Sequence, residues 1–596
     1  MFLVSGSNQL YSPCNLLNKL SFQLNFIKAT FRAFKANNPS ANSVRNSSST
    51  QHLLITFCEV YSHILTIRTD DDFAGEEAFL REIVVNLKPI LCNLYFDEPV
   101  YEGPQLVRRL MCSATKVYNN LYKRWGRGGW CEEELWLWES AARWNGEAGG
   151  DDMADDEENS DDNLVNMFKD VKMARVLNAL PFVLSFDQRV LILSSLIAVD
   201  KRRTQDEMHA MMMLSGEFGP MGEQIRVRRE YIYEDSMKGL NELGTRLRGR
   251  VQVSFLNKHG VEEAGIDGGG VFKEFVDYLV KEAFDADQPL KLVRTTDDLL
   301  LFLNPDVSAT DNFKHFEFLG RVLGKAVYES ILVEPQFCLP FLNKLLNKVN
   351  TLDDLRGFDR VLFNNLSALR RMGEEEIKNL CLTFEVQSSV NSAGTFLGGV
   401  KSVELVSRGS QTPVTKQNCI QYIHLVANHK LNVEQSKATR SFLRGFRDII
   451  PASYVRMFSA KELQKIFSGD DEVKGIDVDD LKNVMVYSGG YHPSQDMIIW
   501  FWQIVKEMEN EMQRKLLRFI TSCSRKPLLG FKALTPVPCI QKTTPSVNSG
   551  GGVGSERLPT SSTCMNLLKL PSYSTKEKLK EKLYYAVNSG AGFELS

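Results

Sequence analysis

Apolar residues recur at helical spacing along the first part of the chain. Residues 79–96 (FLREIVVNLKPILCNLYF) and residues 105–122 (QLVRRLMCSATKVYNNLY) place apolar side chains three or four positions apart. This spacing matches the 3.6 residues per turn of an α-helix and puts those side chains on one face. The spacing continues in residues 171–197. The pattern therefore predicts that the N-terminal region is built from packed helices.

A strand, a glycine loop and a helix follow one another in the middle of the chain. Residues 250–257 (RVQVSFLN) alternate apolar and polar positions, which predicts a strand. The loop GIDGGG, residues 265–270, comes next, and a helical pattern begins at Val271. A phosphate-binding loop needs Lys followed by Ser or Thr after its glycines, and neither is present here. We interpret the glycines as structural residues of a tight turn.

The last 120 or so residues mix the two patterns. Residues 558–570 (LPTSSTCMNLLKL) predict a loop and then a strand, and residues 574–587 (STKEKLKEKLYYAV) predict a helix with Ser574 as its N-cap. Residues 313–470, which lie after the strand at 250–257 and before these last residues, are predicted to be mostly helical with short strands. The expected fold class is α+β.

Two polar stretches mark the expected boundaries. Residues 149–163 (GGDDMADDEENSDDN) are rich in acidic residues, whose mutual repulsion favours a solvated linker. Residues 471–475 are short, polar and preceded by Gly469, which favours a flexible hinge. The parts expected between and beside them are a helical N-terminal region (1–148), a helical connecting segment (164–229), and two further parts (230–470 and 476–596).

Composition excludes several classes of protein. The net charge is −3, so nothing points to a nucleic-acid partner, and no apolar run reaches the roughly 20 residues that membrane insertion requires. The 11 cysteines include no CxxC pair, and the eight histidines form no HExxH pattern, so we expect no metal site. Five of the seven tryptophans lie between Trp125 and Trp144, as expected for a helical core or, alternatively, a partner-binding surface.

Cys564 is the candidate nucleophile, and the residues around it leave its role open. It stands between a Thr/Ser run and the apolar residues that begin at Met565, and a lone cysteine in such a place is most often a small buried hydrophobe. A hydrolase would need a histidine to activate the thiol, and the only histidine after residue 475 is His492. Exchange of an acyl group between two thiols needs no such partner.

Five motifs occur in a fixed order: GIDGGGVFKEF, FEFLGRVLGKAVYE, IDVDDLKNVMVYSGGYHPSQDMIIWFW, SRKPLLGF and LPTSSTCMNLLKLPSYSTKEKLKEKL. They closely resemble motifs of HECT-type ubiquitin ligases over roughly residues 230–596. The resemblance implies a helical N-terminal region followed by a bilobal HECT domain. Its N-lobe would be mainly helical with short strands, and its C-lobe a small α/β unit beyond the hinge. The wording of the glycine loop resembles the subgroup with a helical N-terminal half.

The family resemblance implies a mechanism and partners. Cys564 would accept ubiquitin from a ubiquitin-conjugating enzyme as a thioester and pass it to lysines of protein substrates. This activity would direct protein ubiquitination and proteasomal degradation. It requires no metal and no bound cofactor. The resemblance places such a protein in the cytoplasm, with the nucleus as a second compartment.

The motif carries supporting residues of the catalytic loop. Thr563 matches the threonine before the family's cysteine, and Leu558 and Pro559 match the turn that leads to it. Phe593 matches the C-terminal phenylalanine that helps to position the C-lobe. All four roles are implied by the resemblance.

The groove for the conjugating enzyme maps by the same resemblance to two helices. The assigned residues are Leu362, Leu366 and Leu369 on one helix and Tyr422 and Leu425 on the other. Their spacing puts each set on one helix face, which is equally the pattern of core leucines.

The chain departs from the family pattern in three respects. Met565 follows the cysteine where the family usually has an aromatic residue, Ser562 stands where it often has histidine, and the calmodulin-binding IQ motif of the subgroup is absent. Two alternatives therefore stay open: a HECT-shaped scaffold that no longer transfers ubiquitin, and a cysteine hydrolase acting on ubiquitin conjugates.

Overall fold

The structure is a computed structural model, and its described residues fall into two compact units. The described residues are 24–37, 44, 47–96, 105–142, 171–215, 222–257, 260–262, 270–307, 312–388, 401–469, 476–521, 523–528, 530–534, 536–543 and 557–589. One unit comprises residues 1–196, 351–356 and 456–459, and the other comprises residues 197–350, 357–455 and 460–596. The predicted linker at 149–163, the hinge at 471–475, the glycines at 265–269 and Phe593 lie outside the described residues.

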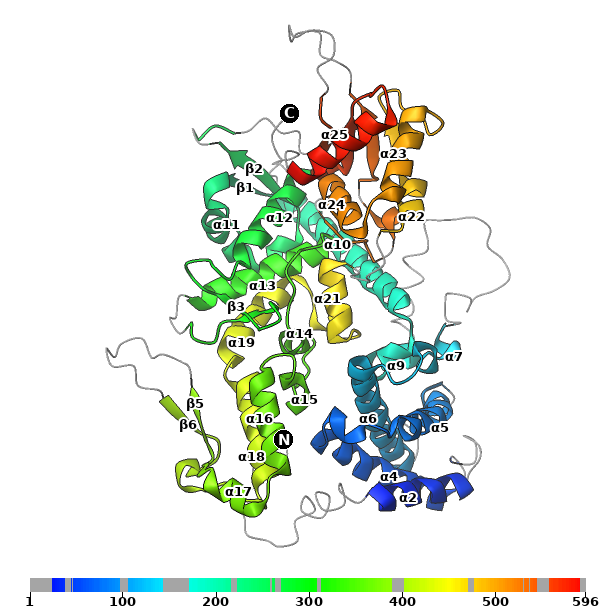
Figure 1. The fold of residues 1–596 in the computed structure, drawn as a ribbon, viewed down its shortest axis with the longest axis vertical. Helices are drawn as coiled ribbons and strands as arrows, with labels where there is room; N and C mark the ends of the chain where they lie inside the picture. The colour runs from blue at the N-terminus through cyan, green and yellow to red at the C-terminus, as the bar shows by residue number, and fades with distance from the viewer. Residues whose placement is uncertain are drawn as a thin grey trace. The chain divides into compact units, whose positions relative to one another are not determined.

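The first unit is helical in the part that the structure describes. Its elements are α2 (Leu24–Asn37), α4 (Ser48–Ile67), η1 (Asp70–Phe73), α5 (Glu77–Phe96), α6 (Gln105–Gly128), η2 (Glu133–Leu135), α7 (Glu139–Ala142), α9 (Val171–Ala179), η4 (Pro181–Val183), the start of α10 (Phe186–Ser215) and the short α15 (Leu352–Leu355). Helices α4 and α6 pack closely against each other, and α2 packs on α4 (Figure 1). The predicted helices at 79–96 and 105–122 are thus present, as α5 and α6.

Aromatic side chains fill the centre of this unit, as one interpretation of the tryptophan cluster predicted. Trp136 and Trp138 are 0% and 1% exposed. The Trp136 ring meets Tyr118 edge-on at 5.1 Å between centroids, and Phe182 stacks on Tyr122 at 3.8 Å. Such rings bury large apolar areas and lock one another in place.

The second unit begins within α10 and, up to residue 469, its described residues hold three two-stranded sheets (β1-β2, β3-β4 and β5-β6) beside the helices. Its elements up to residue 469 are β1 (Glu223–Arg228), η5 (Arg229–Tyr231), α11 (Ile232–Leu240), η6 (Asn241–Arg248), β2 (Val251–Leu256), α12 (Gly270–Ala283), β3 (Val293–Thr295), β4 (Leu301–Leu303), α13 (Asn312–Tyr328), α14 (Leu339–Leu345), α16 (Arg360–Arg371), α17 (Glu374–Asn379), β5 (Glu385–Ser388), β6 (Lys401–Glu404), η7 (Gly409–Gln411), α18 (Cys419–Asn428), the π-turn η8 (His429–Val433), α19 (Ser436–Ile449), α20 (Ala452–Val455) and α21 (Ala460–Ser468). The predicted strand at 250–257 is β2, which pairs in parallel with β1.

Glycines permit the close packing of α13 on α19 (Figure 1). A Cβ atom at Gly445 would stand 1.8 Å from the Glu317 carbonyl oxygen, and one at Gly320 would stand 2.1 Å from that of Phe442. Only glycine permits backbones to approach this closely. The glycines of the segment FEFLGRVLGKAVYE therefore have a packing role.

The remainder of the second unit, residues 476–589, is called the C-terminal part below. Its elements are α22 (Val478–Val484), β7 (Val486–Ser488), α23 (Asp496–Glu507), α24 (Asn510–Thr521), η9 (Phe531–Ala533), β8 (Cys539–Lys542), β9 (Thr560–Ser562), η10 (Thr563–Met565), β10 (Leu567–Leu570) and α25 (Lys576–Ser589). The strands form one sheet in the order β7-β8-β10-β9, in which only β9 runs antiparallel to its neighbour.

The C-terminal part has a hydrophobic core of its own. Ile540 on β8 and Leu568 and Leu570 on β10 are fully buried, and they meet apolar residues of α22, α23, α24 and α25. The predicted helix at 574–587 is α25, but its N-cap is Thr575 and not Ser574. The Thr575 hydroxyl accepts a hydrogen bond from the backbone N–H of Lys578, three residues into the helix.

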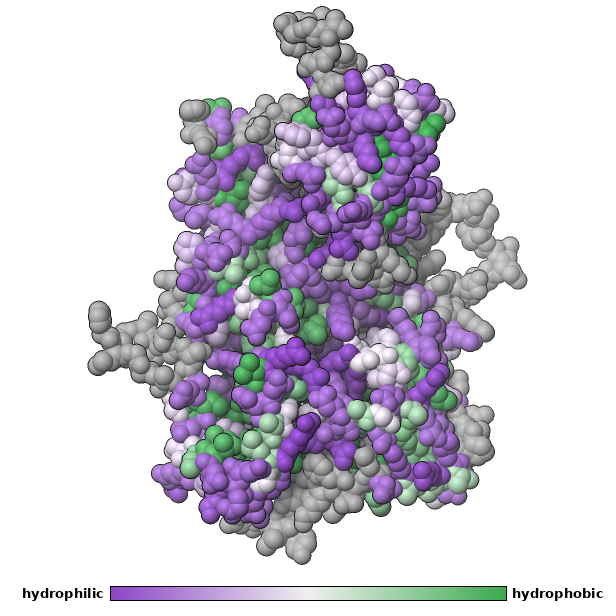
Figure 2. Space-filling view, in the orientation of Figure 1, coloured by the Kyte–Doolittle hydropathy of each residue, from purple (hydrophilic) through white to green (hydrophobic). Residues whose placement is uncertain are grey.

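The surface is mostly hydrophilic on the face shown in Figure 2, where hydrophobic side chains form small separate groups. No helix in the described ranges is long and apolar enough to cross a membrane.

Candidate active site

A four-residue turn at the edge of the C-terminal sheet carries Cys564. Strand β9 pairs antiparallel with β10, with Ser562 opposite Leu567, so residues 563–566 connect two neighbouring strands. The first three form the 3-10 turn η10, in which Cys564 is the middle residue. The strands thus hold the two ends of the turn that contains the cysteine.

Asn566 closes this turn in a left-handed conformation. Its φ is 48° and its ψ is 40°, and its N–H donates to the Thr563 carbonyl at 3.2 Å. Asparagine tolerates this region of backbone space better than most residues. Thr563, which the sequence analysis assigned to the catalytic loop, therefore provides the acceptor that defines the turn.

Hydrogen bonds tie the turn to segments on both sides. The backbone carbonyl of Asn566 accepts a hydrogen bond from the N–H of Cys539 at 3.0 Å. The side-chain Nδ2 of Asn566 donates to the Pro536 carbonyl at 2.6 Å. Lys273 of α12 donates from Nζ to Asn566 Oδ1 at 3.0 Å. Helices α12 and α24 pack against η10. Sequence reasoning missed Lys273 and Asn566, since no local pattern relates two residues so far apart in the chain.

The segment that leads into the turn is also anchored. Leu558 is half-buried against the C-terminal core, and Pro559 is buried. The Tyr573 hydroxyl donates to the Arg557 carbonyl at 2.5 Å. The structure therefore places both predicted lead-in residues beside the turn, and their assigned role stays a prediction.

Several other cysteines are poor nucleophiles because they are wholly or partly buried. Burial raises the pKa of the Cys523 thiol to about 11, that of Cys131 to about 11 and that of Cys338 to about 12. Burial likewise raises the pKa of Cys58 and Cys419. A thiol with so high a pKa is almost never ionised at neutral pH, and the thiolate is the reactive form.

His492, the one candidate partner for a hydrolase, lies in an exposed loop. Its Nδ1 and the hydroxyl of Ser494 are 2.9 Å apart and share a hydrogen bond. This contact orients the ring within its own loop, which follows β7.

The residues assigned to the conjugating-enzyme groove divide into two groups. Leu366 and Leu369 are each 4% exposed, and Tyr422 is 8% exposed, with its ring 5.4 Å from that of Phe384. These three lie in the core between α16 and α18, which pack on each other. Leu362 and Leu425 are half-buried and remain accessible. The groove assignment stays a prediction, and of the five residues these two are the ones that a partner could contact.

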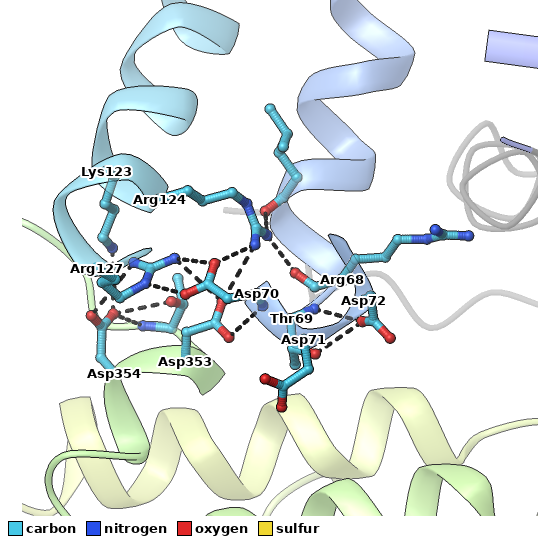
Figure 3. Close-up of polar contacts among 12 residues, drawn as sticks. Arg68, Thr69, Asp70, Asp71, Asp72, Lys123, Arg124, Arg127, Asp353 and Asp354 are labelled. Atoms are coloured by element: carbon cyan, nitrogen blue, oxygen red, sulfur yellow. Dashed lines mark hydrogen bonds and ion pairs between the residues drawn. The ribbon is translucent and has the colours of Figure 1, made fainter. Parts of the chain in front are cut away.

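The first unit contains a buried ionic cluster, which we call the Arg124 cluster (Figure 3). Arg124 and Arg127 of α6 both bind Asp70 of η1, at 2.5 Å and 2.9 Å from its Oδ1. Arg127 also lies 3.4 Å from Oδ2 of Asp353, whose Oδ1 accepts from the N–H of Asp70 at 3.0 Å.

Two further pairs extend the Arg124 cluster. Lys123 lies 3.3 Å from Asp354, and Arg356 lies 2.6 Å from Asp71. At the start of the short helix α15, the Asp354 carboxylate accepts hydrogen bonds from the N–H and the hydroxyl of Thr351. Residues 351–356 thus fold with helices that precede them by more than two hundred residues.

In the residues that the structure describes, no group of three or more His, Cys, Asp or Glu side chains could hold a metal ion.

The fold and the turn that carries Cys564 agree with the HECT family, which the sequence motifs resemble. The chain belongs to this family, because the model of the HECT-domain (ubiquitin-transferase) matches residues 277–596. The chain is similar to E3 ubiquitin-protein ligase UPL6 of Arabidopsis thaliana, with 36% identity over 560 residues, or 91% of this chain and 51% of the relative.

Two other relatives also match most of this chain and about half of their own length. Ubiquitin-protein ligase E3B of Homo sapiens is 32% identical over 590 residues, or 93% of this chain and 52% of the relative. E3 ubiquitin-protein ligase HUL5 of Saccharomyces cerevisiae is 39% identical over 429 residues, or 71% of this chain and 45% of the relative. The chain spans about half the length of the curated relatives it matches.

Proposed function

We propose that this chain is a ubiquitin-protein ligase that carries ubiquitin as a thioester on Cys564. The observation that carries the proposal is the position of Cys564 in a family whose chemistry is ubiquitin transfer. Cys564 is the middle residue of a turn held by two strands, by Asn566 and by Lys273. A supported turn keeps the backbone of its nucleophile in place, which favours a productive geometry.

The reaction proceeds in two steps with the same acyl group. The Cys564 thiolate attacks the C-terminal carbonyl carbon of ubiquitin on the conjugating enzyme, a C–S bond forms, and the conjugating-enzyme thiolate leaves. The amine of a substrate lysine then attacks the new thioester. A C–N bond forms, the Cys564 thiolate leaves, and the amine gives up a proton. Exchange between thiols is near thermoneutral, so the first step needs little beyond a thiolate and a clear approach.

Ubiquitin, a conjugating enzyme and protein substrates are the partners of this reaction, and nucleic acid has no part in it. Product chains would direct substrates to proteasomal degradation. We place the reaction in the cytoplasm, with the nucleus as a second compartment, because it requires a free thiol. The nine cysteines that the structure describes as free thiols support a reducing environment.

A single-turnover assay tests the proposal. The full chain is mixed with activating enzyme, a panel of conjugating enzymes, ATP and labelled ubiquitin, and gels are run with and without reducing agent. A ubiquitin adduct that disappears on reduction is expected in the natural chain and absent in Cys564→Ala. Cys112→Ala is the matched control, because Cys112 is an exposed thiol on α6.

The assay also separates the two alternatives. Absence of an adduct with every conjugating enzyme would overturn the ligase proposal and favour a HECT-shaped scaffold. Release of ubiquitin from a preformed chain, abolished in Cys564→Ala, would favour a hydrolase instead.

A further inference from the structure

The side chain of Asn566 is a buried junction at the base of the Cys564 turn. The residue is 0% exposed, and its left-handed backbone closes the turn. Its N–H and Nδ2 donate to Thr563 and Pro536, and its carbonyl accepts from Cys539. These contacts all lie within the C-terminal part.

The remaining polar atom of this side chain is satisfied from elsewhere. Asn566 Oδ1 accepts from Lys273 Nζ, which belongs to α12 and lies 293 residues earlier in the chain. A buried carbonyl without a donor is costly, so this acceptor favours the arrangement in which Lys273 is in place. The predicted hinge at 471–475 stands between the two residues in sequence. The hydrogen bond therefore joins the turn to the part of the chain that precedes the hinge.

Lys273 does not hold the C-terminal part together. The core of that part consists of residues between Val478 and Val587, all contributed by that part itself. The helix that carries Lys273, α12, and the helix α24 both pack against η10. The hydrogen bond of Lys273 to Asn566 at the base of the turn fits seating the turn and not stabilising the core.

We infer that Lys273 is a positioning residue that seats the Cys564 turn on α12 while ubiquitin passes from Cys564 to the acceptor amine. The inference rests on the proposed function. Acceptance must bring Cys564 to the conjugating enzyme, which is predicted to bind α16 and α18, whereas α12 and α24 hold the turn here. The second step requires the thioester to stay in place while the amine attacks, the C–N bond forms and the Cys564 thiolate leaves.

A pulse–chase experiment on the full chain separates the two steps. The thioester is formed with fluorescent ubiquitin, the supply is stopped, and free lysine is added at several concentrations. Lys273→Met removes the ammonium and keeps an unbranched side chain, and Lys273→Arg keeps a donor for Asn566. Lys281→Met is the matched control, because Lys281 lies on the same helix and pairs with Asp277.

The inference predicts a selective loss in Lys273→Met. Discharge to lysine should slow by roughly tenfold in kcat, the rate change expected when one buried hydrogen bond to a charged group is lost. The KM for lysine should not change, because Lys273 does not contact the acceptor. Acceptance should stay within about twofold, Lys273→Arg should restore most of the discharge rate, and Lys281→Met should behave like the natural chain.

Three results would overturn the inference: unchanged discharge in Lys273→Met, an equal or larger loss in acceptance, or no recovery in Lys273→Arg. Hydrogen exchange gives a second measurement that does not depend on activity. The amides of Asn566 and Cys539 should exchange faster in Lys273→Met than in Lys281→Met, and equal protection would refute seating of the turn. If the natural chain forms no thioester, the proposed function fails, and the exchange measurement still decides whether Lys273 seats the turn.

Discussion

Replacement of Arg124 by methionine should loosen the helical N-terminal unit. The Arg124 side chain is 5% exposed and donates to Asp70 and to the carbonyl oxygens of Leu65, at 2.6 Å, and Arg68. Its guanidinium also lies 4.5 Å from the centroid of the Phe73 ring. Methionine has a similar length and can replace the packing, but it offers no donor.

The expected loss follows from these contacts. Removing one partner of a buried ion pair costs about 3–5 kcal/mol, because the other charge stays buried. Asp70 keeps Arg127 as a partner, so the lower end of this range applies, about 3 kcal/mol. The two carbonyl oxygens lose their donor as well, which argues against a smaller value.

Native-state hydrogen exchange of the full chain measures this loss locally. Amides of α4 and α6 should exchange roughly a hundredfold faster in Arg124→Met, the rate change that corresponds to about 3 kcal/mol. Arg109→Met is the matched control, because Arg109 lies on the same helix and its ion pair with Glu59 is largely exposed. Its exchange should match that of the natural chain, since exposed ion pairs contribute little.

An exchange rate in Arg124→Met within about threefold of the natural chain would refute the reasoning. An equal acceleration of amide exchange in Arg109→Met would also refute it, because a buried ion pair would then contribute no more stability than an exposed one. A double-mutant cycle with Asp70→Asn isolates the pair, and a coupling below about 0.5 kcal/mol would also contradict it.

Two further predictions concern pH and the conjugating-enzyme groove. Burial tends to raise the pKa of Asp70, but the hydrogen bond with Arg127 and the charges of the three nearby arginines (Arg127, Arg124 and Arg356) outweigh burial and hold that pKa below its usual value. Burial and the Asp70 charge raise the pKa of Asp353. The contribution of the Asp70 carboxylate to stability is therefore present above its unfolded pKa of about 3.9 and is lost as the pH falls through its folded pKa. The difference in unfolding free energy between the natural chain and Asp70→Asn, measured by urea denaturation, should narrow below about pH 4. A difference that widens there would disprove this sign. Leu362→Asp should lower affinity for a conjugating enzyme about tenfold in calorimetric titration, while the thermal unfolding transition persists. Leu366→Asp should instead unfold its surroundings, because the new charge is buried. Unchanged affinity in Leu362→Asp would exclude Leu362 from the groove.

The local elements followed closely from the sequence. The helical spacing of 79–96 and 105–122 predicted α5 and α6, and the alternation in 250–257 predicted β2. In these elements the apolar positions are mostly the buried ones, because each element packs one face against the core. The cap of α25 was misplaced by one residue, since Ser574 and Thr575 are both good N-caps and only the backbone geometry distinguishes them.

The predicted groove shows where periodicity stops being informative. Leu362, Leu366 and Leu369 share one helix face by spacing alone, yet Leu366 and Leu369 are buried against α18 and Leu362 is only half-buried. An apolar stripe has the same form whether a partner or the chain's own next helix covers it. Only the packing of α16 on α18 separates these cases.

The sequence by itself determined the family, the candidate nucleophile Cys564 and most of the helices and strands around it, because these depend on short runs of residues. The tertiary structure alone decided that Lys273 reaches Asn566, and that residues 351–356 fold with Arg124 and Arg127 of α6. Lysine, arginine and aspartate are common on every surface, so their types do not reveal which of them are buried together. Long-range pairing of charges depends on how the whole chain packs, and no local pattern records it.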